Sequence, residues 1–263
     1  MNIKQRIIRL IPSKLYVILK GSGWFGNFNS WKEAEAKCDG YNNEMVFQKV
    51  TDSILKVKSG EALFERDSVV FDKADYNFPI LNALMWIALD QQSVLKVIDF
   101  GGSLGSVYFQ NRSFINSIQT VSWNVVEQSK FVEIGNKYIK EERLHFFNSI
   151  SECVQYENCN CVLFSSVLQY IEDPYKIIDE VLKLNIEYIL IDKTSFTLNS
   201  KSRITIQKVP KKIYDVSYPC WLLPENIIVD QFLSNGYRII YEFENQDFIN
   251  LPSIQKGFLF KKM

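Results

Sequence analysis

Two acids of this chain each stand at the end of an apolar segment, and a glycine-rich turn follows the first of them. Asp99 precedes Gly101, Gly102 and Gly105, and Glu127 ends the next apolar segment. In a parallel sheet, strand ends of this kind meet at the carboxyl edge, where nucleosides bind. An ionised carboxylate offers only acceptors, so Glu127 can receive both hydrogen bonds from a ribose diol. The pattern predicts a nucleoside site, with a solvated strand-end charge as the alternative interpretation of Glu127.

The spacing of the glycines narrows the type of nucleoside. A nicotinamide dinucleotide is held by G-x-G-x-x-G, because its two phosphates approach the backbone where no Cβ stands in the way. Counted from Gly101, the second and third glycines of that pattern are replaced by Ser103 and Ser106. The turn therefore does not match the pattern expected for a dinucleotide.

The segment from Asp99 to Gly105 instead resembles the D-x-G-x-G-x-G loop of class I S-adenosylmethionine-dependent methyltransferases, with Ser103 in place of the middle glycine. That departure predicts a tighter pocket floor. The resemblance implies that S-adenosylmethionine is the cofactor, that the turn holds its amino-acid end and that Glu127 holds its ribose. It also implies an adenine contact after the third strand, and a fourth strand that ends under the methyl-bearing sulfur. The cofactor residues so implied are Asp99, Gly101, Gly102, Ser103, Gly105, Glu127, Asn148, Ser149 and Ser165.

Two residues that follow later strands are candidates for catalysis. Tyr170 stands where many methyltransferases of this class carry histidine, and a phenol with an unperturbed pKa of about 10 is a poor base at neutral pH. It is expected to orient a substrate hydroxyl or to pack over the cofactor. Asp192 ends the fifth strand and could take the proton of an acceptor hydroxyl, and an ion pair with Lys193 or a neighbour is the alternative. The single histidine, His145, begins the third strand and is expected to be structural.

Further segments resemble a family of methyltransferases encoded in bacterial surface-polysaccharide (capsule and O-antigen) clusters. The resemblance runs from about residue 24 to the end, and it breaks where Lys193 replaces an arginine and Ser195 a proline. It implies methyl transfer to an oxygen of a sugar, a nucleotide-sugar or a phosphate-type modifying group. The segments that carry it are 24–28, 30–34, 40–41, 65–67, 191–194, 207–210, 213–214 and 217–221.

Aromatic and charged residues in these segments suit recognition of such an acceptor. Flat, partly polar rings can face a sugar or a nucleotide, and Arg66, between Glu65 and Asp67, could be aimed at an anionic group. The alternatives are that the aromatic residues form the core of a lid, and that residues 65–67 are a solvated charge cluster. The candidate substrate residues are Arg66, Gln207, Tyr214, Tyr218 and Trp221.

Two other functions stay open at this point. One is a non-catalytic, nucleotide-sensing module of a polysaccharide assembly complex, which would keep the pocket without a base. The other is a different Rossmann-like enzyme, such as a sugar-nucleotide reductase or epimerase, against which Ser103 and Ser106 count.

The composition fits a globular protein that acts on small molecules. The 263 residues carry 30 basic and 30 acidic side chains, and 47% of them are hydrophobic. This balance disfavours broad binding of nucleic acid, which needs clustered cations. The five cysteines are an odd number and lack zinc-ligand spacing, so a reduced, cytoplasmic protein without a metal site is expected. A small-molecule or glycan-precursor substrate follows, and a homo-oligomer stays open.

The first twenty residues are basic and apolar. They contain five lysines and arginines and no acid. Such a segment can lie on an anionic membrane surface, or it can pack on its own domain or on a partner subunit. No apolar run is long enough to span a bilayer, so only peripheral membrane association is considered.

Residues 1–90 are expected to form a helical cap that contributes to the substrate region. Helices are predicted over residues 30–37, 45–58 and 79–90. Ser30 and Glu33 have the spacing of a capping box, which marks the start of the first of these helices.

Residues 91–263 are expected to form the cofactor-binding domain. Short apolar segments, of which the first covers residues 94–100, alternate there with helical lengths. This alternation predicts an α/β, Rossmann-like fold with helices on both faces of the sheet. The sheet is expected to be mixed and seven-stranded, with an antiparallel final strand. Residues 193–225 are expected to form a substrate loop inserted after the fifth strand.

Overall fold

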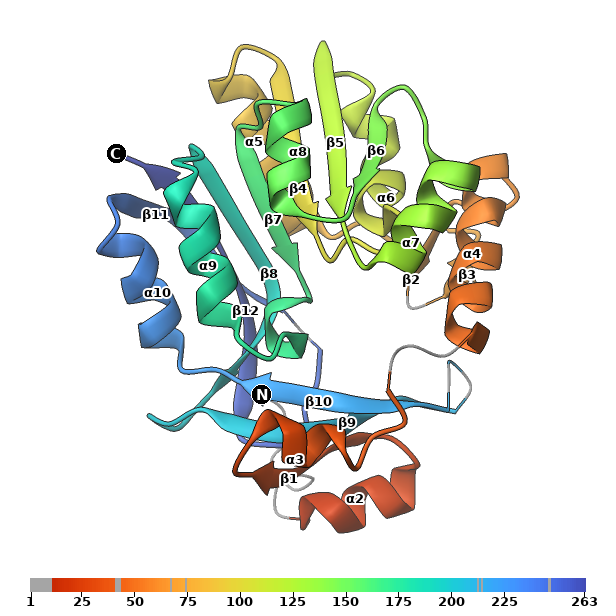
Figure 1. The fold of residues 1–263 in the computed structure, drawn as a ribbon, viewed down its shortest axis with the longest axis vertical. Coiled ribbons are helices and arrows are strands. Elements are labelled where there is room, and N and C mark those ends of the chain that lie inside the picture. The colour runs from red at the N-terminus through yellow and green to blue at the C-terminus, as the bar shows by residue number, and fades with distance from the viewer. Residues whose placement is uncertain are drawn as a thin grey trace.

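The computed structural model describes residues 11–40, 44–66, 68–73, 75–211, 213, 215–245 and 247–263. Its centre is a seven-stranded sheet with the order β11-β12-β8-β7-β4-β5-β6 (Figure 1). Neighbouring strands from β6 to β8 are parallel, whereas β12 is antiparallel to both of its neighbours, so the predicted mixed sheet is confirmed. The strands are β4 (Val94–Phe100), β5 (Thr120–Val126), β6 (Leu144–Phe147), β7 (Cys161–Ser165), β8 (Tyr188–Thr197), β11 (Tyr237–Asn245) and β12 (Ser253–Lys262).

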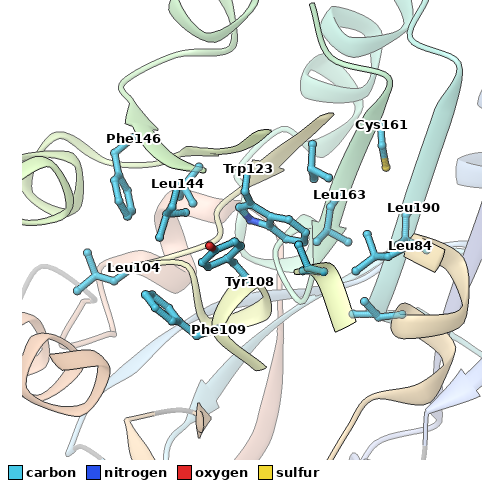
Figure 2. Close-up of a cluster of buried hydrophobic side chains, with 14 of the residues drawn as sticks. Leu84, Leu104, Tyr108, Phe109, Trp123, Leu144, Phe146, Cys161, Leu163 and Leu190 are labelled. Carbon is cyan, nitrogen blue, oxygen red and sulfur yellow. The ribbon is translucent and has the colours of Figure 1, made fainter. Parts of the chain in front are cut away.

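Helices cover both faces of this sheet, as predicted. One hydrophobic cluster joins the sheet to the helices of the first face, and Figure 2 shows its centre, where Trp123 lies beside Tyr108. A second cluster joins the sheet to the helices of the other face. The first set comprises α4 (Glu44–Ser59), α5 (Phe78–Asp90), α6 (Ser106–Ile115), and α7 (Ser129–Ile134) with its π-helical continuation η1 (Gly135–Ile139); the second comprises α8 (Ile150–Tyr156), α9 (Pro174–Lys183) and α10 (Glu225–Leu233).

The direction of strand order reverses between β4 and β7. The chain passes from β4 to β5 and β6 on one side, then returns to β7 and β8 on the other side of β4. Ligands of open α/β sheets bind beyond the carboxyl ends of the strands at such a point. The fold therefore places the ends of β4, β5 and β7 around one potential site.

The N-terminal region contains the predicted helices and also strands. The three helices expected from the sequence are present as α3 (Trp31–Glu35), α4 and α5. At the first, the Ser30 hydroxyl accepts the Glu33 backbone N–H at 3.2 Å, which confirms this half of the predicted capping box. The region also contains strands that were not predicted, namely β1 (Gly23–Phe28) and the hairpin of β2 (Phe64–Arg66) and β3 (Val69–Phe71). An additional helix, α2 (Ser13–Lys20), precedes β1.

The segment expected as a substrate loop also forms strands. β9 (Arg203–Lys208) lies between β1 and β10 (Ser217–Leu222) in an antiparallel three-stranded sheet. β9 alternates polar and apolar residues, which is a strand pattern, and its central place depends on β1, about 180 residues earlier in the chain. Pro219 is tolerated in β10 because this strand lies at an edge of the sheet.

This small sheet lies across the carboxyl ends of the main strands. Figure 1 shows β9 and β10 below the ends toward which β5 and β7 point. β10 contacts β8 and the 3₁₀ turn η2 (Leu168–Tyr170), which follows β7. The potential site therefore has the main sheet on one side and the three-stranded sheet on the other. Within the described ranges, no helix has both the length and the apolar character needed to cross a membrane.

Candidate active site

The turn after β4 is shaped by two close approaches of the backbone. A Cβ on Gly101 would lie 2.3 Å from a methyl carbon of Val167, and a Cβ on Gly102 would lie 2.4 Å from the carboxyl group of Asp99. The Gly101 N–H donates to the carbonyl of Val126 at 2.9 Å, which ties the turn to the end of β5. Only glycine fits at these two positions, so the turn is held tightly between β5, the segment after β7 and the Asp99 carboxylate.

Ser103 adopts a backbone conformation that favours glycine. Its φ is 54°, in the left-handed region, where a side chain with a Cβ is strained. The resemblance to methyltransferase loops predicts a glycine at this position, and the structure gives the physical reason for that preference. The serine therefore keeps the shape of the turn at a cost in backbone energy.

The carboxylate of Asp99 is fully enclosed and only half satisfied. One oxygen, Oδ2, accepts the indole N–H of Trp123 at 2.9 Å. The other oxygen, Oδ1, has no hydrogen-bond partner within the described part of the chain. Burial raises the pKa of Asp99 to about 7, and the nearby charge of Glu127 raises it further, while the Trp123 hydrogen bond opposes the shift. A buried carboxylate oxygen without a donor is uncommon in folded proteins and calls for an explanation.

Glu127 lies at the end of β5 and faces the glycine turn. Its carboxylate accepts the backbone N–H groups of Gln128 and Ser103. Burial raises the pKa of Glu127 to about 7, and these two hydrogen bonds limit the rise. A carboxylate has about four acceptor sites, so two N–H donors leave room for a diol. The structure thus brings Asp99, the turn and Glu127 together.

The end of β6 lies next to Glu127, and its polar residues cap a helix. The Glu127 N–H donates to the carbonyl of Phe147 at 3.1 Å. The Ser149 hydroxyl accepts the N–H of Glu152 at 3.1 Å, so it caps α8, a helix that the sequence analysis did not predict. The Asn148 side chain is exposed beside this cap. Its backbone N–H and its amide both donate to a carboxylate oxygen of Glu152, at 2.9 and 3.5 Å, so Asn148 belongs to the same cap as Ser149.

Asp192 is also fully enclosed, but three donors from three elements hold it. The Ser165 hydroxyl and the Asn77 amide both donate to Oδ2, at 3.0 and 3.1 Å. The Asn245 amide donates to Oδ1 at 3.3 Å. Burial raises the pKa of Asp192, and the charge of Lys193 and the three hydrogen bonds oppose the shift. The alternative interpretation of Asp192 was an ion pair with Lys193 or a neighbour, but the Lys193 ammonium instead lies 3.6 Å from a carboxylate oxygen of Asp247.

Tyr170, Gln207 and Tyr218 form one cluster between the two sheets. The Tyr170 hydroxyl donates to the Gln207 side-chain carbonyl at 2.7 Å. The rings of Tyr170 and Tyr218 meet edge to face, with centroids 5.2 Å apart. Gln207 and Tyr218 are paired across β9 and β10. Three candidate residues that lie far apart in the sequence are thus neighbours beside the end of β7.

The other candidate substrate residues are placed differently. Trp221 donates its indole N–H to the carbonyl of Ile171 at 3.1 Å and stacks on Trp31 at 6.0 Å, so it joins the small sheet to the segment after η2. Arg66 pairs with Asp75 at 3.0 Å, and its guanidinium lies over Phe71. Tyr214 lies outside the described residues, as does Asp67.

Three residues of the site were missed by the sequence analysis. Trp123 holds Asp99, and it could have been found from the parallel register, which pairs Val97 with Trp123 and therefore places Asp99 close by on the same face. Asn77 and Asn245 hold Asp192 from the start of α5 and the end of β11. No local pattern marks these two, because they approach Asp192 only in the folded chain.

His145 and the cysteines lie apart from this cluster. His145 is half-buried in β6, where burial lowers its pKa, and its ring lies 3.4 Å from the Tyr156 hydroxyl. All five cysteines are free thiols. Within the described ranges, no group of three or more histidine, cysteine or acidic side chains could hold a metal ion.

Comparison with known proteins supports the fold at low sequence identity. No family model matches this chain, and no curated protein does. The N-terminal domain of EvdMO1, crystallised in the presence of SAH and D-fucose, is similar with a TM-score of 0.51 and 9% identity, over 82% of this chain and 97% of that domain. Magnesium protoporphyrin IX methyltransferase (ChlM) from Synechocystis PCC 6803 with bound SAM is similar with a TM-score of 0.47 and 13% identity, over 84% of this chain and 100% of that one. With the strand order described above, the EvdMO1 match establishes a class I methyltransferase fold.

Proposed function

We propose that this chain is an S-adenosylmethionine-dependent methyltransferase that acts on a small hydroxylated acceptor. The observation that carries the proposal is Asp99, a fully enclosed carboxylate with one oxygen that has no donor in the described part of the chain. The methionine part of the cofactor bears an ammonium group, which is the kind of donor that this oxygen lacks. The glycine turn, the end of β5 and the strand-order reversal all lie next to it.

The residues present fit this cofactor. Asp99 and the turn of Gly101, Gly102, Ser103 and Gly105 would hold its amino-acid end, and Glu127 would accept from its ribose. Asn148 and Ser149 lie beside Glu127 for the adenine, and Ser165 ends the neighbouring β7. When bound, S-adenosylmethionine supplies a methyl group on a positively charged sulfur, which needs no acid to activate it.

The cluster of Tyr170, Gln207 and Tyr218 would position the acceptor. The Tyr170 hydroxyl donates its proton to Gln207, and a phenol oxygen is also the type of group that accepts from a hydroxyl. The contact between the two tyrosine rings fixes the phenol at the end of β7. Alignment of the incoming oxygen is a large part of catalysis in a transfer of this type.

For Asp192, the surroundings support a positioning role more than direct proton abstraction. A general base must come within hydrogen-bond reach of the proton that it takes. The Asp192 carboxylate is fully enclosed, and Asn77, Ser165 and Asn245 occupy its oxygens. Three of the about four acceptor sites of this carboxylate are therefore taken, and an acceptor hydroxyl could use only the remaining one. We therefore propose that Asp192 orients Ser165 and the start of α5 beside the site.

We further propose that the acceptor is a sugar, a nucleotide-sugar or a phosphate-type group of a bacterial surface-polysaccharide precursor. The support is the resemblance of several segments to methyltransferases of such gene clusters, together with the aromatic faces of Tyr170 and Tyr218. The similar EvdMO1 domain was crystallised in the presence of D-fucose, which is consistent with a sugar acceptor.

Calorimetric titration with S-adenosylmethionine, S-adenosylhomocysteine and NAD tests the cofactor. We expect micromolar binding of the first two, equivalent to about −8 kcal/mol, and no binding of NAD. Glu127→Ala should weaken binding by about 3 kcal/mol, since two hydrogen bonds to a charged group are lost. Glu133→Ala, which removes an exposed acid of α7 from the same region, is the matched control and should bind as the wild type does. Binding of NAD alone would instead indicate a reductase or epimerase.

A transfer assay tests the reaction itself. The protein is incubated with S-adenosylmethionine labelled in its methyl group and with small-molecule and glycan fractions from the source cell. We expect label in one fraction, and a product heavier than its precursor by one CH₂ group. Cofactor binding without transfer to any fraction would favour the non-catalytic, nucleotide-sensing module.

A further inference from the structure

The helix α2 carries an exposed apolar stripe on the outside of the small sheet. Leu15, Ile18 and Leu19 are 45%, 69% and 67% exposed, at the i, i+3 and i+4 spacing that places them on one helical face. Val17 is the only residue of the helix that is buried. Figure 1 shows α2 beyond β1, at the edge of the molecule that lies farthest from the main sheet.

The helix is fixed in this position, so the stripe faces outward in the folded protein. α2 packs on β1, and the ring of Tyr16 lies 3.1 Å from where a Cβ of Gly23 would stand. Gly21 ends the helix in the left-handed conformation, and its N–H donates to the carbonyl of Val17 at 2.8 Å. The stripe is therefore not a frayed end that could fold back onto the core.

Both charged residues of α2 are lysines. Lys14 and Lys20 are exposed at the two ends of the helix, and the helix has no acid in its first turn. In the sequence, the first acid of the whole chain is Glu33, after six lysines and arginines. A second copy of the chain would bring these like charges together, which opposes self-association through this face.

The size of the stripe also argues against a protein partner. An eight-residue helix is about 12 Å long. Its three exposed apolar side chains are far fewer than the roughly 20–30 residues that each side of a stable protein interface contributes. A lipid surface needs no complementary shape, and it accepts a short apolar face that is flanked by cations. We propose that α2 docks this protein on an anionic membrane surface, with Leu15, Ile18 and Leu19 in the interface.

This proposal does not depend on the proposed methyl transfer, but it has a consequence for it. Tyr16 of α2 also lines a cavity of about 150 Å³ together with Trp24 and Gln207. Gln207 receives the hydrogen bond from Tyr170. A membrane contact through α2 would therefore hold the acceptor side of the proposed site near the lipid headgroups.

Vesicle sedimentation with the full chain tests the docking. The probes are vesicles of phosphatidylcholine alone and of an equimolar mixture of phosphatidylcholine and phosphatidylglycerol. We expect binding to the anionic vesicles, weaker binding at high salt and little binding to neutral ones. Ile18→Ser with Leu19→Ser should reduce binding at least tenfold, and Lys14→Gln with Lys20→Gln should reduce it by about fivefold for each lysine.

Matched substitutions elsewhere on the surface are the controls. Leu89→Ser with Leu198→Ser removes two leucines that are 78% and 59% exposed, and Lys130→Gln with Lys183→Gln removes two exposed lysines. Neither control should change binding, and circular dichroism should show that all variants are folded. The proposal is overturned if the wild type ignores anionic vesicles or if the controls lose as much binding. It is also overturned if Ile18→Ser with Leu19→Ser turns a dimer into a monomer in analytical ultracentrifugation, which would identify a second copy as the occupant.

Discussion

Asp99 and Asp192 are both fully enclosed at the carboxyl edge of the main sheet, one on each side of β7, yet their surroundings differ. Three side-chain donors occupy Asp192, whereas Asp99 has one donor and one oxygen without a partner in the described part of the chain. Burial of a charge is costly unless hydrogen bonds compensate for it. The comparison is consistent with the proposal that Asp192 stabilises its side of the edge and that Asp99 binds a ligand.

Alanine substitution of the two aspartates tests this contrast most strongly. Asp192→Ala leaves the amides of Asn77 and Asn245 and the Ser165 hydroxyl without their acceptor, so we expect a loss of about 3–5 kcal/mol in the free energy of unfolding. Asp99→Ala removes one hydrogen bond with Trp123 and also removes an uncompensated buried charge, so its loss should be about 1 kcal/mol or less. Denaturant unfolding measures both values. Equal losses of unfolding free energy would show that the two acids stabilise the fold to the same extent, which contradicts the contrast.

The pH dependence of stability sharpens the same comparison on the Asp99 side. Burial raises the pKa of Asp99 and that of Glu127 to about 7, above the values of about 3.9 and 4.3 of the free side chains. Between these limits the folded chain binds more protons than the unfolded chain, so stability falls as the pH rises through the window. We expect a decrease of about 2–3 kcal/mol from each of the two acids between about pH 5 and about pH 8.

Denaturant unfolding at several pH values checks this expectation, with Asp99→Asn as the test variant. The amide side chain of this variant does not titrate, so the decrease should become clearly smaller. Asp52→Asn, which changes an exposed acid of α4, should show the same change of unfolding free energy with pH as the wild type. A wild-type protein that gains stability over this range would contradict the raised pKa values of both buried acids.

The contrast also separates what the sequence could predict from what it could not. The turn after Asp99 and the position of Glu127 follow from local signals, because an apolar run that ends in an acid marks a parallel strand. For the same reason, the predicted first and last residues of β4 agree with the structure. In contrast, two of the three donors of Asp192 come from the start of α5 and from β11, and nothing near Asn77 or Asn245 in the sequence marks their approach.

The small sheet was missed for a related physical reason. β9 gains its neighbours from β1 and β10, and the pairing with β1 is the least local one in the fold. A proline in β10 made the segment resemble a loop, although an edge strand tolerates it. Even so, the segments that resemble methyltransferases predicted Tyr170, Gln207 and Tyr218 as site residues, and the small sheet is what brings them together.

Glycine substitution at two strained serines, one near each aspartate, is the test with the smallest expected effect. Ser103 on the Asp99 side and Ser166 on the Asp192 side share a φ of 54°. Ser103→Gly and Ser166→Gly should each stabilise the chain by about 0.5–1 kcal/mol, because relief of left-handed strain exceeds the extra freedom of the unfolded glycine. Denaturant unfolding of the two variants beside the wild type measures this gain.

Cofactor titration then distinguishes the two serines. The Ser103 backbone N–H that Glu127 accepts is kept in Ser103→Gly, so cofactor affinity should change by less than about threefold despite the gain in stability. If Ser166→Gly gains stability but Ser103→Gly loses stability, the Ser103 hydroxyl itself forms a hydrogen bond within the turn or to the ligand. The serine would then be a functional replacement for the glycine of the similar methyltransferase loops, and the strain at this position would be part of how the Asp99 side holds its ligand.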